Sequence, residues 1–375
     1  MKVFKQAQIK NKKVLLRIDF NVPLTTNDKR QTTISDDSRI RAALPTIEYL
    51  INHGAAKIIL LSHLGRPKGK FVSDLSLWPI ANHLSKLLKS SAKFSGPQKE
   101  YQIADKIILL ENIRFEPGEE KNDPVFAKKL AGMADSPRGE AGIFVNDAFS
   151  CIHRGHASTE GIIHFLPSFT GFQMEKEIEN LSKILNPNRP FVCIMGGAKA
   201  KDKIGVIENL AGKTDYFLLA GVIANTFLKA KGEDIKSSTV VDEMLDTAKK
   251  FLEKYKEKIT LSEYGVYGDL NGRRAILDIG KKDIKIFDKY IKKARTIFWN
   301  GNLGMTEKPE FANGSSQIAR SIVASKAFTV AGGGDTVAFI NSIGLAKKFS
   351  FLSLAGGAAL EFLAGKKLPG LSNLL

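Results

Sequence analysis

The chain has 375 residues, of which 43% are hydrophobic, and its formal net charge is +17 at pH 7. This length predicts about two or three domains, each large enough to bury a core. Cys151 and Cys193 are the only cysteines, which excludes a disulfide-rich scaffold. The basic residues are dispersed, with no Lys/Arg run longer than two. This dispersion favours a solvated surface and small anionic ligands over a nucleic-acid-binding tail.

The sequence also bears on where the protein works. No uncharged stretch reaches the roughly 18 apolar residues that a membrane span needs. Residues 1–6 have no apolar region of the kind that a signal peptide carries. We therefore expect a soluble, cytoplasmic protein without a membrane partner.

Short apolar runs rich in β-branched residues recur along the chain and predict strands buried on both faces. They span residues 14–20, 58–61, 107–110, 143–145, 191–195, 216–220, 275–279, 296–299, 328–331 and 351–354. Segments with helical spacing lie between most of them, including 39–53, 171–185 and 241–258, and Pro45 predicts a kink or a later start in the first. This alternation predicts an α/β fold with parallel sheets. Pro187 and Pro190 follow the helix at 171–185, so we place a domain junction there, with about five strands on each side.

In the first half of the chain, the predicted strands end in polar and charged residues. Ligands bind at the carboxyl ends of parallel strands in open α/β folds, so these side chains are expected to converge. Arginine suits such a site because its planar guanidinium binds carboxylate and phosphate through two hydrogen bonds. The residues are Asp19, Asn21, Arg39, His63, Arg66, Arg114 and Arg154. Together they predict a pocket for a small anion that carries a hydroxyl group, in which His63 donates to an anionic oxygen and Asp19 and Asn21 accept from the hydroxyl.

Other interpretations of these residues remain open. Cys151 lies close to His153, as in a thiol nucleophile, but no orienting partner is evident. His63, His153 and His156 offer metal ligands, which Arg154 between the last two disfavours by repelling a cation. Asp19 and Asp147 are also compatible with turn formers or helix caps.

In the second half, the predicted strands end in glycine-rich turns. Gly196, Gly197 and Lys199 follow one strand and precede a predicted helix, on which Lys199 and Lys203 would share a face. Asp335 follows another strand through Gly332, Gly333 and Gly334, where it would ligate Mg²⁺ or cap a helix. Residues 299–304 and 353–357 repeat the pattern. Several such turns at one sheet edge predict a site for a phosphate chain.

These segments, in this order, resemble phosphoglycerate kinase over nearly the whole chain. The motifs are RIDFNVP at 17–23, SHLGRPKG at 62–69, LENIRF at 110–115, VNDAF at 145–149, HRGH at 153–156, GGAK at 196–199, DKIG at 202–205 and GGGDT at 332–336. The resemblance implies two Rossmann-like three-layer domains with mostly parallel sheets, joined by a helix and a hinge. It places an acid-substrate domain at 1–170, with the tail 362–375 packing back on it, an interdomain helix at 171–187 and a nucleotide domain at 188–361.

The resemblance further implies reversible phosphoryl transfer between ATP and 3-phosphoglycerate, giving ADP and 1,3-bisphosphoglycerate. Transfer would be in line, in a closed two-domain cleft, by a monomer that uses Mg²⁺ with its nucleotide. The acid substrate would be held by Asp19, Asn21, Arg39, His63, Arg66, Arg114 and Arg154. The nucleotide would be held by Gly197, Lys199, Lys203, Asn300, Glu307, Gly332, Gly333, Gly334, Asp335 and Thr336, with Asp335 on the metal. The catalytic groups would be Arg39, Lys199, Gly356 and Gly357.

Departures from the family pattern lie in the second half. Asn302 replaces a usual proline, and Thr306 replaces an aromatic residue that precedes the ribose-binding Glu307. Leu354 and Ala355 replace Thr and Gly in a glycine-rich turn, where alanine resists a positive φ. The segment 258–275 is shorter than expected, which predicts that one strand of the nucleotide domain is reduced or missing. These changes leave nucleotide preference open. They also motivate an alternative, a catalytically impaired member that binds phosphoglycerate or nucleic acid.

Overall fold

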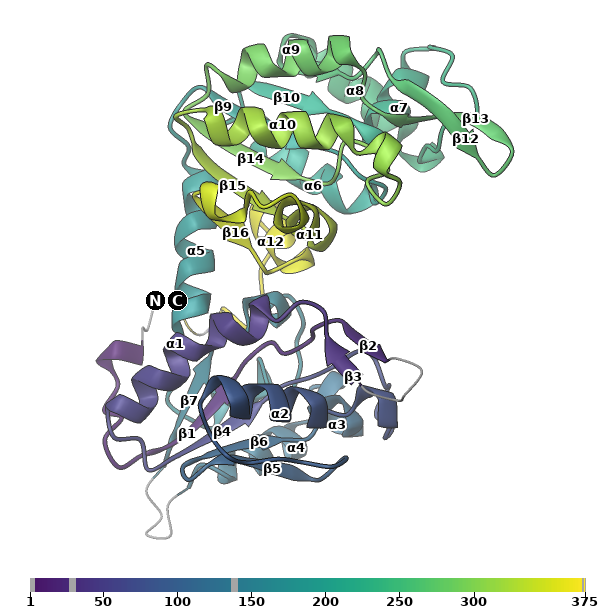
Figure 1. The fold of residues 1–375 in the computed structure, drawn as a ribbon. Helices are drawn as coiled ribbons and strands as arrows, with labels where there is room; N and C mark the ends of the chain where they lie inside the picture. The colour runs from purple at the N-terminus through teal and green to yellow at the C-terminus, as the bar shows by residue number, and fades with distance from the viewer. Residues whose placement is uncertain (1–3, 27–31, 136–140, 373, 375) are drawn as a thin grey trace. The chain divides into compact units, whose positions relative to one another are not determined.

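The computed structural model describes residues 4–26, 32–135, 141–372 and 374. The chain forms two compact units, drawn in Figure 1. Unit 1 comprises Met1–Ile178 and Lys367–Leu375, and unit 2 comprises Glu179–Lys366. The division falls inside helix α5 (Phe172–Leu185). Both units are built on largely parallel sheets, which confirms the predicted α/β class.

Unit 1 has a six-stranded sheet in the order β5-β6-β4-β1-β7-β8. Its strands are β1 (Lys13–Arg17), β4 (Lys57–Leu61), β5 (Glu100–Ala104), β6 (Ile107–Leu110), β7 (Ile143–Asn146) and β8 (Ser168–Thr170), and only β5 is antiparallel to its neighbour. The helices are α1 (Ser38–Asn52), α2 (Trp78–Leu87), α3 (Pro117–Glu120) and α4 (Pro124–Gly132), and β2 (Leu24–Thr26) pairs antiparallel with β3 (Thr32–Ile34).

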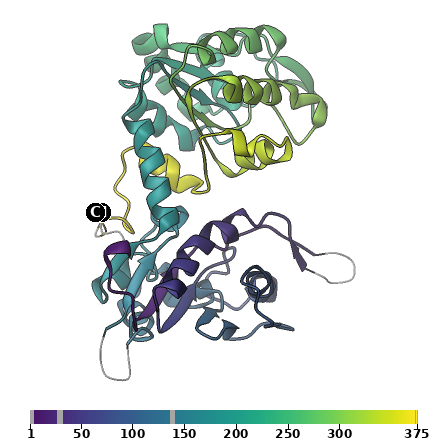
Figure 2. The ribbon, with the colours of Figure 1, turned by 60° about the vertical axis from the view of Figure 1, so that its left-hand side comes forward.

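Side chains of the central strands alternate between two cores in unit 1. Leu16 of β1 packs in a cluster with α1 and α2, including Ile47 and Leu84. Leu15 packs on the opposite face, with Leu130 of α4. Successive strand residues point to opposite faces, so an apolar run can fill both cores at once. Figure 2 shows these layers from a second direction.

Unit 2 has a six-stranded, fully parallel sheet in the order β11-β10-β9-β14-β15-β16. Its strands are β9 (Phe191–Met195), β10 (Tyr216–Leu219), β11 (Ile259–Leu261), β14 (Thr296–Asn300), β15 (Phe328–Gly332) and β16 (Phe351–Ser353). The helices are α6 (Lys201–Leu210), α7 (Gly221–Ala230), α8 (Leu245–Tyr255), α9 (Lys281–Ile291), α10 (Asn313–Ala324), α11 (Gly334–Ser342) and α12 (Gly357–Leu363). Helices α9 and α10 pack on β9 and β14 around Trp299.

One predicted strand belongs to a different sheet. The run at 275–279 falls largely in β13 (Arg273–Asp278), which pairs antiparallel with β12 (Val266–Leu270) in a separate two-stranded sheet. Asn271 and Gly272 have φ of 55° and 77° and make the turn between them. Two successive positive φ angles give the tight turn that joins antiparallel strands. The expectation of a parallel strand there was therefore wrong, and the segment 258–275 holds the three-residue β11 together with β12.

Helix boundaries also differ from the sequence expectations. Helix α1 begins at Ser38 and continues through Pro45, so the later start was wrong. Helix α6 begins at Lys201, so Lys199 precedes it and does not share a helix face with Lys203. In the part of the chain that the structure describes, no helix has both the length and the apolarity to cross a membrane.

Candidate functional site

An ion pair fixes Arg39 beside the end of β1 in unit 1. Its Nη1 atom lies 2.8 Å from Asp19 Oδ2 and donates to the Asn21 carbonyl oxygen at 2.9 Å. The other carboxylate oxygen of Asp19 accepts the Asn21 backbone N–H, and Ser150 donates to Asp19 Oδ2. Asp19 therefore positions Arg39 and orders the loop of Asn21. Its contact with a substrate hydroxyl stays a prediction, because a carboxylate can accept more hydrogen bonds than these.

His63 lies among four arginines. Its Nδ1 atom accepts a hydrogen bond from Arg17 Nη2 at 3.1 Å. Burial, followed by the charges of Arg17, Arg114, Arg39 and Arg154, holds the pKa of His63 well below its usual value. The ring is therefore neutral at physiological pH, and because Nδ1 faces a donor, the proton sits on Nε2. His63 is thus prepared to donate from Nε2 to an anion.

The remaining predicted arginines differ in burial. Arg114 is 2% exposed, and its Nη1 donates to the Gly65 carbonyl oxygen at 2.8 Å. Its Nη2 atom is buried and makes no hydrogen bond with any residue that the structure describes. Arg154 donates from Nε to His153 Nε2 at 3.1 Å. The charges of Arg39, Arg114 and Arg154 all act on His63, whereas Arg66 is exposed.

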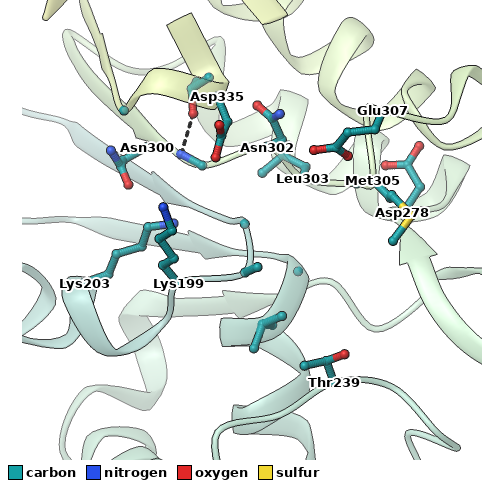
Figure 3. Close-up of a pocket in the computed structure, with 18 of the residues that line it drawn as sticks. Lys199, Lys203, Thr239, Asp278, Asn300, Asn302, Leu303, Met305, Glu307 and Asp335 are labelled. Carbon is teal, nitrogen blue, oxygen red and sulfur yellow. Dashed lines mark hydrogen bonds between the residues drawn. The ribbon is translucent and has the colours of Figure 1, made fainter. Parts of the chain in front are cut away.

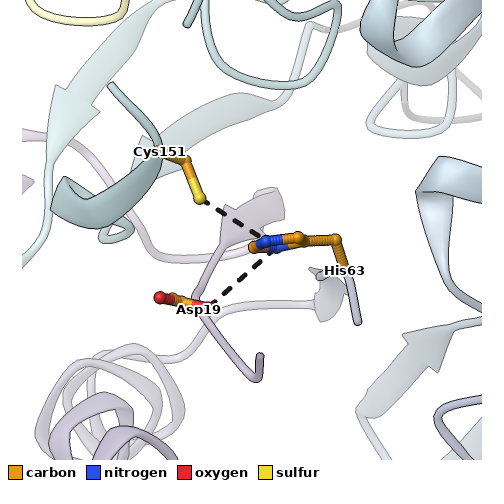
Figure 4. A group of neighbouring side chains, drawn as sticks. All are labelled: Asp19, His63 and Cys151. Atoms are coloured by element: carbon orange, nitrogen blue, oxygen red, sulfur yellow. Dashed lines mark hydrogen bonds and ion pairs between the residues drawn. The ribbon is translucent and has the colours of Figure 1, made fainter. Parts of the chain in front are cut away.

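Asp19, His63 and Cys151 point toward one another, as Figure 4 shows. Their ligand atoms all lie within 4.8 Å, a spacing that invites a metal. However, Arg17 Nη2 lies 3.1 Å from His63 Nδ1 and 3.6 Å from Cys151 Sγ. A guanidinium at that position repels a metal cation and occupies the ring nitrogen, so this cluster fits an anion site better than a metal site.

Unit 2 contains a pocket with a cavity volume of about 680 Å³ at the carboxyl ends of its strands. Of the residues predicted for the nucleotide, those that line it are Gly197, Lys199, Lys203, Asn300, Glu307, Gly333, Gly334, Asp335 and Thr336. Two residues predicted as catalytic, Gly356 and Gly357, also line it. Gly332 is the exception among the predicted nucleotide residues. It is the last residue of β15, and its carbonyl oxygen accepts from Asn300 Nδ2 at 2.7 Å.

Close packing of backbone shapes the floor of this pocket. Gly197 and Gly301 have φ of 78° and 92°, a region that favours glycine. A Cβ atom on Gly301 would overlap with the Gly196 carbonyl oxygen, and one on Gly196 would overlap with the Asn302 carbonyl oxygen. Gly221, with φ of 60°, also packs on Gly197. The close approach of these turns at Gly196 and Gly301 therefore requires glycine.

Charged side chains line opposite sides of the pocket. Figure 3 shows Lys199 and Lys203 on one side and Asp335, Asn302 and Glu307 on the other. Lys203 is 5% exposed and donates to the Gly196 carbonyl oxygen, whereas Lys199 is exposed. Asp335 lies in the first turn of α11, whose N-cap is Gly333 rather than Asp335. Among the described residues no side chain pairs with the Asp335 carboxylate, which leaves its oxygens available to a cation.

In the altered turn near residue 355, the left-handed backbone conformation falls on a glycine. The positive φ of this turn, 57°, lies at Gly356, and Ala355 has no positive φ. Ala355 is 2% exposed, and Gly356 precedes α12 as its N-cap. The alanine therefore causes no backbone strain, contrary to the expectation from the sequence.

Sequence reasoning missed two groups that shape these sites. Arg17 is fully buried at the end of β1, and an arginine inside an apolar strand was the available signal. Asp278 lines the pocket of unit 2 and accepts from the backbone N–H groups of Ile279 and Gly314 at 2.8 Å each. Burial raises the pKa of Asp278 to about 6. Asp278 is the last residue of β13, in the hairpin of β12 and β13 that was not predicted from the sequence.

Comparisons with known proteins agree with this geometry. The family model "Phosphoglycerate kinase" matches residues 4–366. A phosphoglycerate kinase of Moorella thermoacetica is 44% identical over 398 residues, covering 99% of this chain and 98% of that protein. One from Dictyoglomus turgidum is 45% identical, covering 99% of this chain and 97% of that protein.

Solved structures of the same kind are similar in fold. The phosphoglycerate kinase from Coxiella burnetii has a TM-score of 0.82 at 36% identity, covering 99% of this chain and 98% of its own. The one from Pyrococcus horikoshii has a TM-score of 0.83 at 31% identity, covering 100% of this chain and 98% of its own. The chain belongs to the phosphoglycerate kinase family, whose members are phosphotransferases of glycolysis.

Proposed function

We propose that this chain catalyses reversible phosphoryl transfer between ATP and 3-phosphoglycerate, with ADP and 1,3-bisphosphoglycerate as the other pair. The observation that carries the proposal is the unit 2 pocket, where glycine-rich strand ends, two lysines and an unpaired aspartate converge. Such a combination suits a nucleotide phosphate chain and its metal. Membership of the family supports the choice of substrates. The same membership leads us to expect a monomer that works in the cytoplasm.

The arginine cluster of unit 1 would bind the acid substrate. Arg114 has a buried Nη2 without a hydrogen-bond partner among described residues, and an anionic oxygen would satisfy it. Arg39 and Arg154 add positive charge, and His63 donates from Nε2. Asp19 keeps Arg39 in place, and Asn21 Oδ1 accepts the Gly65 N–H, which orders the loop that carries Arg66.

The unit 2 pocket would bind the nucleotide, with phosphates at the lysine and glycine end and the nucleoside toward Glu307. Mg²⁺ fits the free carboxylate oxygens of Asp335, because this ion prefers oxygen ligands and few protein carboxylates. When bound, Mg²⁺ would neutralise phosphate charge. Thr336 Oγ1 accepts the Gly301 N–H at 2.8 Å and Asn300 bonds to Gly332, which ties the turns after β14 and β15 together.

The mechanism follows from charge. The carboxylate of the acid substrate is itself a nucleophile, so no general base is needed. Phosphoryl transfer depends on positioning and on electrostatic stabilisation of the equatorial oxygens. In this proposal Arg39 and Lys199 would supply the cations for these oxygens, and Gly356 and Gly357 would supply backbone N–H groups at the start of α12.

A coupled assay with purified protein, Mg-ATP and 3-phosphoglycerate tests this proposal. The expected result is ADP formation that requires both substrates. No ADP formation at high protein concentration, with 3-phosphoglycerate binding intact in a calorimetric titration, would instead support the impaired binding protein. Comparing initial rates with ATP and GTP decides the nucleotide preference.

A further inference from the structure

The loop at residues 301–308, which follows β14, carries Glu307 at the pocket of unit 2. Glu307 is exposed and lines the pocket, and Figure 3 shows it on the same side as Asn302. In the part of the chain that the structure describes, its carboxylate has no hydrogen-bond or ion-pair partner. Its direction therefore depends on the shape of the loop that holds it.

A side-chain hydrogen bond closes this loop immediately before Glu307. Asn302 is 8% exposed, and its Nδ2 donates to Thr306 Oγ1 at 2.6 Å. Asn302 Oδ1 is buried without a hydrogen-bond partner among described residues, so the bond to Thr306 is what fixes the amide. Backbone bonds from Met305 to Leu277 O at 2.8 Å and from Thr306 to Gly304 O at 3.0 Å complete the loop.

The roles of Asn302 and Thr306 are connected, because the two side chains contact each other directly. Their hydrogen bond closes the four-residue step that leads to Glu307, so the loss of either partner frees the segment on which Glu307 is carried.

We propose that Asn302 and Thr306 are positioning residues whose hydrogen bond aims Glu307 at the ribose hydroxyls of the bound nucleotide. The inference rests on the proposed function, because it requires a nucleotide in this pocket. A carboxylate has two oxygens that accept hydrogen bonds, and a vicinal diol supplies two donors, so the match depends on orientation. The pair thereby sets how strongly the pocket prefers a nucleotide with ribose hydroxyls over one without them.

The test measures calorimetric affinity for ADP and for 2′,3′-dideoxy-ADP. Thr306 does not line the pocket, so Thr306→Val removes the hydroxyl without removing a lining group. We expect Thr306→Val to weaken ADP binding by about 5-fold, as for loss of one net hydrogen bond, and to leave dideoxy-ADP binding nearly unchanged. Thr306→Ser, which retains a hydroxyl, should restore the preference for ADP.

A double-mutant cycle with Glu307→Ala separates positioning from general damage. Glu307→Ala should abolish the preference, and adding Thr306→Val to it should cause no further change, because Thr306 acts through Glu307. Equal weakening of both ligands by Thr306→Val, or an unchanged preference, would overturn the inference while leaving nucleotide binding established. Failure of the unmodified protein to bind ADP at all would instead reject the proposed function.

Discussion

The candidate anion sites of the two units differ in whether side chains or backbone form them. Unit 1 uses side chains, with buried or paired arginines held by Asp19 and by backbone carbonyls around a neutral His63. Unit 2 uses backbone, with turns that approach closely because Gly196 and Gly301 lack a Cβ atom. The first site should therefore be sensitive to loss of charge. The second should be sensitive to gain of a methyl group, because its shape depends on the path of the chain.

The largest effect is expected from Arg39→Ala. Loss of one preorganised cation at a phosphoryl-transfer site should lower kcat at least about 100-fold, or about 3 kcal/mol. Arg41→Ala is a matched control, because Arg41 lies on the same helix but is exposed and pairs with Asp37. The coupled assay measures kcat for both variants. An Arg39→Ala variant that retained most of the activity would contradict the claim that the unit 1 site depends on this charge.

A methyl group added to the close-packed turns of unit 2 should lower the stability of the protein. Gly301→Ala forces φ of 92° on alanine and a clash with Gly196, so we expect a loss of about 3 kcal/mol in the free energy of unfolding. Gly272→Ala also has a positive φ, 77°, but meets no atom within 4 Å, and should cost about 1 kcal/mol. Urea denaturation of both variants measures their free energies of unfolding, and the difference separates the cost of the positive φ from the cost of the steric clash. Similar losses in the two variants would show that the turn at Gly301 does not depend on close packing.

Asp335→Asn tests the metal assignment in unit 2. If Asp335 holds Mg²⁺, the concentration of Mg²⁺ that half-saturates ADP binding should rise about 10-fold, while metal-free ADP binding stays unchanged or improves. A calorimetric titration of ADP at several Mg²⁺ concentrations measures this. An unchanged Mg²⁺ dependence would contradict the assignment.

The smallest effect concerns acid stability in unit 1. Burial, then the charges of Arg114, Arg17, Arg154 and His153, lower the pKa of His156 to about 3. A histidine whose pKa is lower in the folded state binds its proton only on unfolding, so it reduces stability as the pH falls below about 6.5 and toward 3. His156→Gln should therefore lose about 1 kcal/mol less stability than the unmodified protein between pH 7 and pH 4.5. The free energy of unfolding, measured by urea denaturation across this pH range, checks the prediction. Equal losses for the unmodified protein and His156→Gln would show that protonation of His156 does not contribute to acid instability.

Much of the fold was predictable because the central strands are continuous apolar runs that fill two cores. The hairpin of β12 and β13 was missed although Asn271 and Gly272 carry its turn signal. Local apolarity made residues 275–279 resemble a sheet strand, and only the tertiary structure shows that they pair with β12 alone. The marginal strands β5, β8 and β11 have weaker patterns, and two of them have only three residues.

The sequence predicted which residues belong to the two candidate sites better than it predicted how those residues contact one another. Strand-end position identified His63 and Arg114, the start of the first helix identified Arg39, and glycine content identified the turns of unit 2. Spacing along the chain did not reveal that Asp19 pairs with Arg39, because a local pattern does not contain contacts between separate elements. The start of α6 at Lys201 was missed because helix boundaries are poorly defined by a local pattern.

The most direct test of the division between the two sites is a pair of calorimetric titrations, with 3-phosphoglycerate and with ADP, on the Arg39→Ala and Lys199→Ala variants. We predict that Arg39→Ala weakens 3-phosphoglycerate binding about 10-fold or more and leaves ADP binding within about 2-fold, and that Lys199→Ala does the reverse. A variant that weakens both ligands equally, or only the ligand assigned to the other unit, would contradict the account.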